Sequence, residues 1–241
     1  MDGQAIIQVE TISKHYGANI ALKQVSFQVN QGEIFGITGT DGSGKSTLLT
    51  LMKGQSIPDE GVIMVLDYDV YADIERLREH KNLFMRSAFL IEKLTVVESL
   101  EMFQNLYDGF DNVDIILKQF ELLPYRDNLV RDLPVELKQR TLLATMVVLN
   151  PSIIFLDEPT TGLNAEAKKE YWNILSLLKM QGKTIIIISH DMSEIQYHCD
   201  RVGVMKGGRL VVCNSPKRLI GELPKEGYSM EAVYMYYAVG S

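Results

Sequence analysis

The spacing of hydrophobic and polar residues divides the chain into strand-like and helix-like stretches. Apolar positions alternate with polar ones across residues 5–29, which predicts strands connected through residues 14–17. Residues 33–38, 153–157 and 183–188 are instead short and nearly continuous apolar runs. Such runs are typical of strands that are buried on both faces of a parallel sheet.

Helical spacing dominates the middle of the chain, from about residue 83 to residue 139. One predicted helical face carries Val96, Val97, Leu100, Phe103 and Leu106, and a second carries Ile115, Ile116, Phe120 and Leu123. Residues 135–149 and 165–179 predict two more helices, and residues 202–205 and 209–213 predict a hairpin. The order of elements predicts an α/β fold with a mostly parallel core sheet, an N-terminal antiparallel β subdomain and an inserted helical subdomain.

Composition and charge narrow the class of protein. The 241 residues are 46% hydrophobic and 23% charged, as in a globular protein of one large domain or two small ones. The net charge of −7 argues against a nucleic-acid-binding surface as the main function. Cys199 and Cys213 lack a metal-type spacing, so we expect buried thiols in a reducing cytosol. No signal-peptide pattern and no apolar stretch of roughly 20 residues is present, so we expect a soluble protein that would reach a membrane through a partner.

A glycine-rich segment between a predicted strand and a predicted helix fits the phosphate-binding pattern of Gly, four residues, then Gly-Lys-Ser. The segment consists of Gly39, Thr40, Asp41, Gly42, Ser43, Gly44, Lys45, Ser46 and Thr47. Its glycines allow a tight turn that presents N–H groups to phosphate oxygens. Lys45 brings a cation to the β- and γ-phosphates, and the Ser46 hydroxyl can ligate Mg²⁺. The flanking strand and helix disfavour the alternative of a glycine-rich turn with a chance lysine.

Two carboxylates and a histidine follow later predicted strands. Asp157 ends an apolar strand and Glu158 comes directly after it. Asp157 would hold Mg²⁺ through its water shell, and Glu158 is placed to polarise an attacking water as general base. Taken alone, an Asp-Glu pair at this place is more often a solvated strand end than a catalytic pair. The phosphate-binding segment earlier in the chain makes the catalytic pair the favoured interpretation. His190 follows another apolar strand, where a lone histidine is usually structural; in this arrangement it can reach a γ-phosphate.

These motifs resemble the nucleotide-binding subunit of an ATP-binding-cassette (ABC) transporter over nearly the whole chain. Residues 39–47 resemble Walker A, residues 156–159 resemble Walker B, and residues 188–191 resemble the segment with the switch histidine. Tyr16 matches the aromatic residue that stacks on adenine; the alternative is a surface tyrosine near a turn. The resemblance implies ATP and Mg²⁺ as ligands, with Glu158 and His190 as catalytic residues.

The sequence departs from this family where it should read Leu-Ser-Gly-Gly-Gln. The corresponding residues are Leu133, Pro134, Val135, Glu136 and Leu137, in a register set by Gln139-Arg140. In this family two subunits dimerise head to tail, and the signature of one contacts the phosphates bound by the other. Pro134 offers neither hydroxyl nor N–H for that contact, and Glu136 would bring a carboxylate towards those phosphates. The same stretch is sound chemistry for starting a helix, so we expect a retained helix that has lost its ligand role.

Two further family positions also differ. The Q-loop glutamine of the family should lie just before the helical insert, near residues 84–87, and Arg86 or Ser87 takes its place there. An arginine there could stabilise phosphate charge or form a salt bridge with a partner, and the sequence does not choose between them. The aspartate of the family's D-loop is Asn164, which weakens a contact that crosses the dimer.

The resemblance leads to a functional expectation. An intact nucleotide site with a degenerate signature predicts an ATP-binding and hydrolysing subunit in an asymmetric cassette pair, with weak activity when isolated. Its expected partners are transmembrane permease subunits and a second cassette with an intact signature, at the inner face of the cell membrane. The alternatives are an ATP-binding regulatory or dimerisation module and, less favoured for this acidic chain, a soluble cassette acting on ribosomes or DNA.

We expect one domain in residues 1–241, with a catalytic core and β subdomain in 1–85 and 139–220 and a helical subdomain in 86–138. Residues 94–109 are similar to exporters of the drug, lipid or polysaccharide type. The tail, residues 221–241, carries Tyr228, Tyr234, Tyr236 and Tyr237. A helix packed on its own domain is favoured over a partner-docking surface for this tail.

Overall fold

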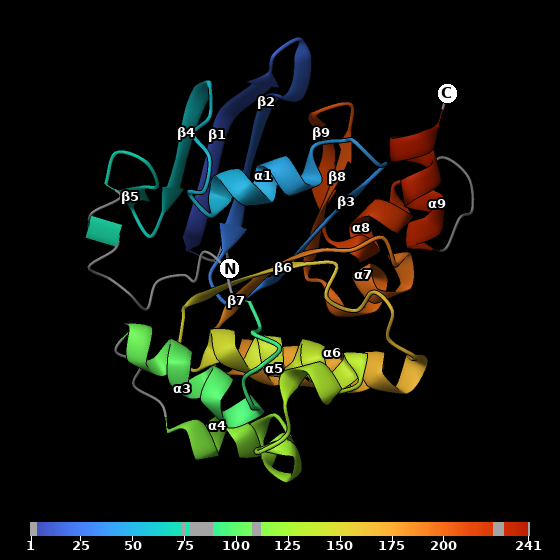
Figure 1. The fold of residues 1–241 in the computed structure, drawn as a ribbon. Coiled ribbons are helices and arrows are strands. Elements are labelled where there is room, and N and C mark those ends of the chain that lie inside the picture. Colours follow the sequence, from blue (N-terminus) through green and yellow to red (C-terminus); the bar gives the residue numbers. More distant parts are fainter. Residues whose placement is uncertain (1–3, 74–75, 78–88, 108–111, 224–228, 241) are drawn as a thin grey trace.

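The structure is a computed structural model that describes residues 4–73, 76–77, 89–107, 112–223 and 229–240. Figure 1 shows two groups of strands at one side of the molecule and a group of helices at the other. Arg86, Ser87 and Tyr228 lie outside the described residues.

The strands form two sheets. The first is antiparallel, with the order β2-β1-β4-β5, and consists of β1 (Ala5–Tyr16), β2 (Asn19–Asn30), β4 (Glu60–Val65) and β5 (Tyr68–Asp69). The second has the order β6-β7-β3-β8-β9 and consists of β3 (Ile34–Gly39), β6 (Ile153–Asp157), β7 (Thr184–Ile188), β8 (Arg201–Lys206) and β9 (Arg209–Asn214). Its first four strands are parallel and β9 pairs antiparallel with β8, so the predicted core sheet and hairpin are confirmed.

The central strand β7 shows why the apolar runs become buried strands. Ile185 and Ile187 pack into one hydrophobic core, and Ile186 and Ile188 into another, because side chains alternate between the two faces of a strand. One core holds α1 (Lys45–Met52), which packs between the two sheets. Helices cover the other face. Every position of this strand, from Thr184 to Ile188, is therefore buried, as a parallel sheet covered on both faces requires.

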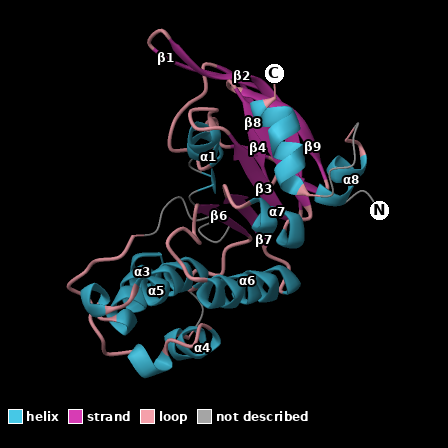
Figure 2. Ribbon diagram, turned by 90° about the vertical axis from the view of Figure 1, so that its right-hand side faces the viewer, coloured by secondary structure: helices cyan, strands magenta, loops and turns pink. Residues whose placement is uncertain are grey.

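The helices occupy the far face and the far end of the core sheet. Beneath the sheet lie α5 (Val135–Val147) and α6 (Ala165–Met180), with α3 (Val96–Tyr107) and α4 (Val113–Gln119) beyond them (Figure 2). Short 3-10 turns connect this group at Leu123–Tyr125 and Val130–Asp132. Beside the sheet lie α7 (Met192–His198), α8 (Pro216–Gly221), α9 (Met230–Tyr234) and a π-helical turn at Met235–Val239.

Some details of the sequence prediction were wrong. Leu106 and Ile115 are each 62% exposed and Leu123 is 47% exposed, although all three were assigned to buried helical faces. In α3, Leu106 is rotated away from the stripe that starts at Val96, since each residue turns the helix by about 100°. Residues 14–16 belong to β1 and not to the connection, which is the tight turn after Tyr16.

The tail packs on its own domain, as expected. Met230 and Val233 of α9 are fully buried, and Tyr234 and Tyr237 pack against the same core. Cys199 is buried and Cys213 is half-buried, and both are free thiols. Within the described ranges, no helix has both the length and the apolar character that crossing a bilayer would need.

Because β7 is buried on both faces, an alanine substitution in this strand should destabilise the protein. Ile187→Ala should lower the free energy of unfolding by about 2–5 kcal/mol, because it leaves a cavity in a packed core. Ile115→Ala is the matched control on the exposed face of α4, and should change stability by less than about 0.5 kcal/mol. Urea denaturation measures both, and equal losses would contradict the placement of β7.

Candidate nucleotide-binding site

A pocket of about 310 Å³ opens where three parallel strands end. Its lining residues are Tyr16, Asn19, Ala21, Asp41, Gly42, Ser43, Gly44, Lys45, Ser46, Thr47, Asp157, Glu158, Ile188 and His190. The ladders pair Ile37 of β3 with Ile188 of β7, and Ile188 with Asp157 of β6. Because parallel strands end at the same edge of a sheet, the loops that follow β3, β6 and β7 meet there.

The loop after β3 has the backbone of a phosphate cradle. Gly39, Gly42 and Gly44 all have positive φ, at 148°, 71° and 100°. A Cβ on Gly44 would lie 2.5 Å from the Ala21 carbonyl oxygen, so only glycine fits there. The loop leads directly into α1, whose free N–H groups and dipole favour an anion at this end.

Lys45 lies folded back on the loop. Its Nζ donates hydrogen bonds to the carbonyl oxygens of Gly39 and Thr40, both at 2.9 Å. Burial lowers the pKa of Lys45, and the negative charges of Asp41, Glu158 and Asp157 oppose that shift. A bound polyphosphate would offer this ammonium group stronger, charged acceptors than two neutral carbonyls.

Glu158 and His190 lie next to each other across the pocket. His190 Nε2 is 3.2 Å from Glu158 Oε1 and 3.7 Å from Asp41 Oδ1. Glu158 is held with a positive φ of 48° and donates its N–H to the Ile188 carbonyl oxygen at 3.0 Å. Its Oε2 accepts a hydrogen bond from Thr161 at 3.3 Å. A strained backbone of this kind at a carboxylate in a pocket is typical of functional sites.

The oxygen donors in the pocket fit a hard cation that accompanies a phosphate. The side chains of Ser46 and Asp157 both line it, one from the start of α1 and one from the end of β6. Across the described residues, no group of three or more His, Cys, Asp or Glu could hold a metal ion by itself. Mg²⁺ bound with a nucleotide needs few protein ligands, since phosphates and water supply the others.

Tyr16 lies at the rim of the pocket, at the end of β1. Its side chain is 51% exposed, and Lys14 Nζ is 5.5 Å from the centre of its ring. An exposed ring beside a phosphate cradle can stack on a planar base. The structure therefore brings Tyr16 together with the loop, the carboxylates and His190.

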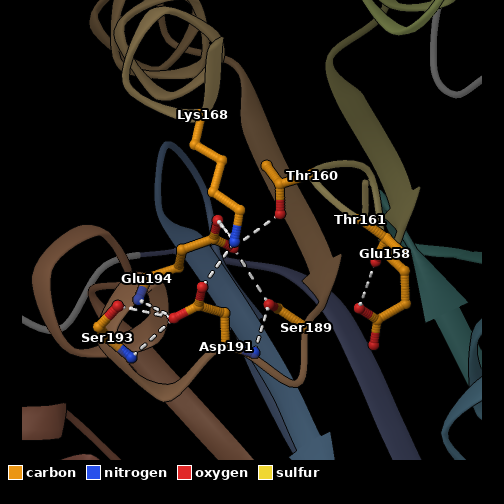
Figure 3. Close-up of polar contacts among 8 residues, drawn as sticks. All are labelled: Glu158, Thr160, Thr161, Lys168, Ser189, Asp191, Ser193 and Glu194. Carbon is orange, nitrogen blue, oxygen red and sulfur yellow. Dashed lines mark hydrogen bonds and ion pairs between the residues drawn. The ribbon is translucent and has the colours of Figure 1, made fainter. Parts of the chain in front are cut away.

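A polar network around Ser189 and Asp191, the residues on either side of His190 in the sequence, was missed in the sequence analysis (Figure 3). Lys168 of α6 donates to Asp191 at 2.7 Å and lies 3.2 Å from Glu194. Glu194 also accepts hydrogen bonds from Thr160 at 2.8 Å and Ser189 at 3.2 Å. The only sequence signal was Asp191 followed three residues later by Glu194, the spacing of a helix N-terminus.

Opposing effects set the pKa of Asp191. Burial acts to raise this pKa, but hydrogen bonds from Lys168, Ser193 and the Glu194 N–H outweigh it and lower the pKa to about 2. The hydrogen bond to Asp191 in turn raises the pKa of Lys168. Both groups therefore remain charged through the neutral range.

Known proteins share this arrangement. The profile of the ABC transporter family matches residues 22–161. The chain belongs to the ABC transporter family. The probable multidrug ABC transporter ATP-binding protein YbhF of Escherichia coli (strain K12) is 31% identical over 222 residues, or 90% of this chain and 38% of that protein. The Nod factor export ATP-binding protein I of Rhizobium etli is 34% identical over 223 residues, or 90% of this chain and 70% of that protein.

Solved ABC proteins have the same fold. The structure of cbiO1 from Clostridium perfringens, part of the ABC transporter complex cbiONQ, has a TM-score of 0.79 and 27% identity, and covers 90% of this chain and 91% of its own. The chain is thus an ATP-binding, ATPase-type domain of an ABC transporter, and the predicted family and fold are confirmed. It spans only about two fifths of the length of YbhF.

The predicted signature segment, residues 133–137, lies outside the nucleotide pocket. Pro134 is the N-cap of α5 and forms no side-chain capping hydrogen bond, one position earlier than expected for a proline in the first helical turn. Leu133 and Leu137 are buried, Val135 is 46% exposed, and Glu136 lies in the first turn. The helix is present, but its first turn presents a valine and a carboxylate.

Asn164, the predicted D-loop residue, has a local partner. It is the N-cap of α6, and its Oδ1 accepts a hydrogen bond from the Ala167 N–H at 2.9 Å. An asparagine is as good a helix cap as an aspartate but carries no charge. The Q-loop positions Arg86 and Ser87 lie outside the described residues.

The clash at Gly44 predicts different costs for two neighbouring alanines. Gly44→Ala and Gly42→Ala both place an alanine at positive φ, which costs about 1–2 kcal/mol. Only Gly44→Ala adds a clash with Ala21, so its loss of stability should be larger by about 1–3 kcal/mol. Chemical denaturation compares the two variants, and equal losses would argue against the close approach.

The lowered pKa of Asp191 predicts a pH dependence. A carboxyl with a pKa of about 2 when folded and near 3.8 when unfolded stabilises the fold above about pH 4, and that contribution is lost as the pH falls towards 2. Asp191→Asn keeps a helix-capping side chain, so the difference in unfolding free energy from wild type should be present at pH 7 and shrink below pH 4. A constant difference across this range would contradict the charged contact.

Proposed function

We propose that this chain binds and hydrolyses ATP to power transport across a membrane, working with separate transmembrane permease subunits. The observation that carries the proposal is the pocket itself, where Glu158 and His190 lie 3.2 Å apart beside the phosphate loop. A general base for water and a side chain that can contact the γ-phosphate are what ATP hydrolysis requires there.

The residues divide the chemistry among them. The loop N–H groups and Lys45 bind the phosphates, with the Lys45 ammonium group exchanging its two carbonyl partners for phosphate oxygens. Ser46 and Asp157 would hold Mg²⁺, which when bound neutralises phosphate charge. Glu158 orients and deprotonates the attacking water, and His190 donates a hydrogen bond to the γ-phosphate. Tyr16 stacks on the adenine.

The signature segment supports an asymmetric pair. In ABC dimers this segment serves the nucleotide of the opposite subunit, and here Pro134 has no N–H to offer. Glu136 would add a like charge, and at about 4 Å the repulsion is about 1–4 kcal/mol per charge pair, depending on the effective dielectric. We propose that a second cassette with an intact signature completes the site of this chain, while the second cassette's own nucleotide turns over slowly.

The transported substrate is proposed only by class. Relatives carry names that refer to multidrug transport and Nod factor export, and residues 94–109 resemble those of exporters. We propose export, with the chain at the inner face of the membrane through its permease. Within it, residues 86–138 would act as the helical subdomain between the core segments 1–85 and 139–220.

A second candidate is an ATP-binding regulatory or dimerisation module with little hydrolysis. The degenerate signature and Asn164 favour it, since both belong to the contacts that complete a catalytic dimer. The pairing of Glu158 with His190 favours hydrolysis instead, because a module that only binds ATP needs no general base.

Restoring the signature tests the proposal. The purified chain alone should hydrolyse ATP slowly. The variant Pro134→Ser/Val135→Gly/Glu136→Gly/Leu137→Gln should raise kcat at least about 10-fold, because a twin can then supply hydrogen-bond donors to the γ-phosphate. The rate per subunit should also rise with protein concentration, as dimer formation demands.

Two controls complete this experiment. Adding Glu158→Gln to the restored variant should abolish the gain, which assigns the activity to the proposed base. Rapid and cooperative hydrolysis by the unmodified chain would overturn the asymmetric pair. A restored variant that dimerises with ATP but remains inactive would favour the regulatory module.

A further inference from the structure

Lys168 is the centre of a charge cluster that no step of ATP binding uses. It lies one helical turn after Asn164, to whose carbonyl oxygen its N–H donates at 2.9 Å. Its ammonium group crosses from α6 to the loop after β7, where it contacts Asp191 at 2.7 Å and Glu194 at 3.2 Å (Figure 3). One cation therefore serves two carboxylates on the element that follows His190.

The cluster holds the His190 loop from both sides. Ser189 donates from its hydroxyl to Glu194 at 3.2 Å, and the Asp191 N–H donates to the same hydroxyl at 3.1 Å. Asp191 also caps α7 through the N–H groups of Ser193 and Glu194. The residues directly before and after His190 are thus tied to the cluster, while His190 itself is 45% exposed and faces the pocket.

Burial makes the lysine important to this arrangement. The Glu194 side chain is only 6% exposed, and a buried carboxylate needs a charged partner or hydrogen bonds. Thr160 and Ser189 donate to its Oε2, whereas Lys168 is the cation beside its Oε1. If Lys168 were removed, the carboxylates of Asp191 and Glu194 would remain as two like charges on one short segment. The segment would then move to separate or hydrate them.

We propose that Lys168 is a positioning residue for His190: it anchors the loop formed by residues 189–191 to α6 and so keeps His190 within reach of Glu158. Because α6 begins at the D-loop residue Asn164, a shift of the D-loop when a second cassette docks would pass through Lys168 to His190. The positioning of His190 by Lys168 is independent of the proposed function. Only the effect of Lys168 on ATP hydrolysis rests on the proposed function.

The first measurement reads the position of His190 directly. His190 is one of four histidines, so its imidazole signals can be assigned by NMR with a His190→Gln variant. Lys168→Met should shift or broaden those signals in the purified chain, because the loop loses its anchor. Lys168→Arg keeps the charge and should leave them close to wild type. Lys169→Met, at the exposed neighbouring lysine, is the matched control and should have no effect.

The second measurement reads hydrolysis, in single turnover with the signature-restored variant in excess over ATP. Lys168→Met should lower the rate about 10- to 100-fold while the affinity for a fluorescent ATP analogue changes less than about 3-fold, as expected for misplacement of a group that acts on the transition state. Lys168→Arg should recover most of the rate. A purely structural lysine would lower thermal stability without this separation of rate from affinity.

Each outcome decides the proposal. Unchanged His190 signals in a folded Lys168→Met variant would overturn it. If that variant does not fold, Lys168→Met/Glu194→Gln removes the cation together with the buried charge, and the same NMR reading applies. If His190 signals respond but even the signature-restored chain does not hydrolyse ATP, the proposed function fails and the positioning role stands. If that chain is active and Lys168→Met does not slow it, the positioning role fails alone.

Discussion

The site depends on one constraint: three apolar strands must lie parallel and in register inside the protein. The pairing of Ile37 with Ile188, and of Ile188 with Asp157, brings three loops far apart in sequence to a single edge. Hydrophobic burial on both faces of β7 enforces that register, because a slip by one residue would exchange the faces of every side chain. The loops that carry Lys45, Glu158 and His190 are therefore brought together by the packing of the core strands.

The charges around this edge determine what a polyphosphate needs in order to bind there. The pocket already contains Asp41, Asp157 and Glu158, so a polyphosphate needs Lys45, the loop N–H groups and a divalent cation to bind there. At the start of α5, the N-cap residue Pro134 has neither a hydroxyl nor an N–H to donate, and Glu136 adds a negative charge in the first turn. The helix α6 lies between the two regions: Glu170 contacts the buried Arg140 of α5, and Lys168 contacts the loop of His190. One helix thus connects α5 with the loop that carries His190.

The hydrophobic pattern predicted the strands of the core sheet well, because strands buried on both faces are apolar at nearly every position. It was less reliable for Leu106, Ile115 and Leu123, which are hydrophobic yet exposed. Periodicity identifies an apolar position but not whether another element covers it, and α3 and α4 lie at the edge of the fold where cover is incomplete (Figure 2). The chemistry of the pocket was predictable for a different reason, since a phosphate cradle is built from a local run of backbone.

The sequence by itself determined the phosphate loop, the carboxylates at the end of β6, the histidine after β7, and the proline and glutamate at the start of α5. Each of these is a local pattern whose residue types state its chemistry. Only the tertiary structure decided that His190 lies between Glu158 and Asp41, and that Lys168 joins α6 to Asp191 and Glu194. Those contacts join residues that are at least 23 positions apart in the sequence, and they depend on the crossing of helices over a sheet. No spacing along the chain encodes them, because they arise only when the core has packed.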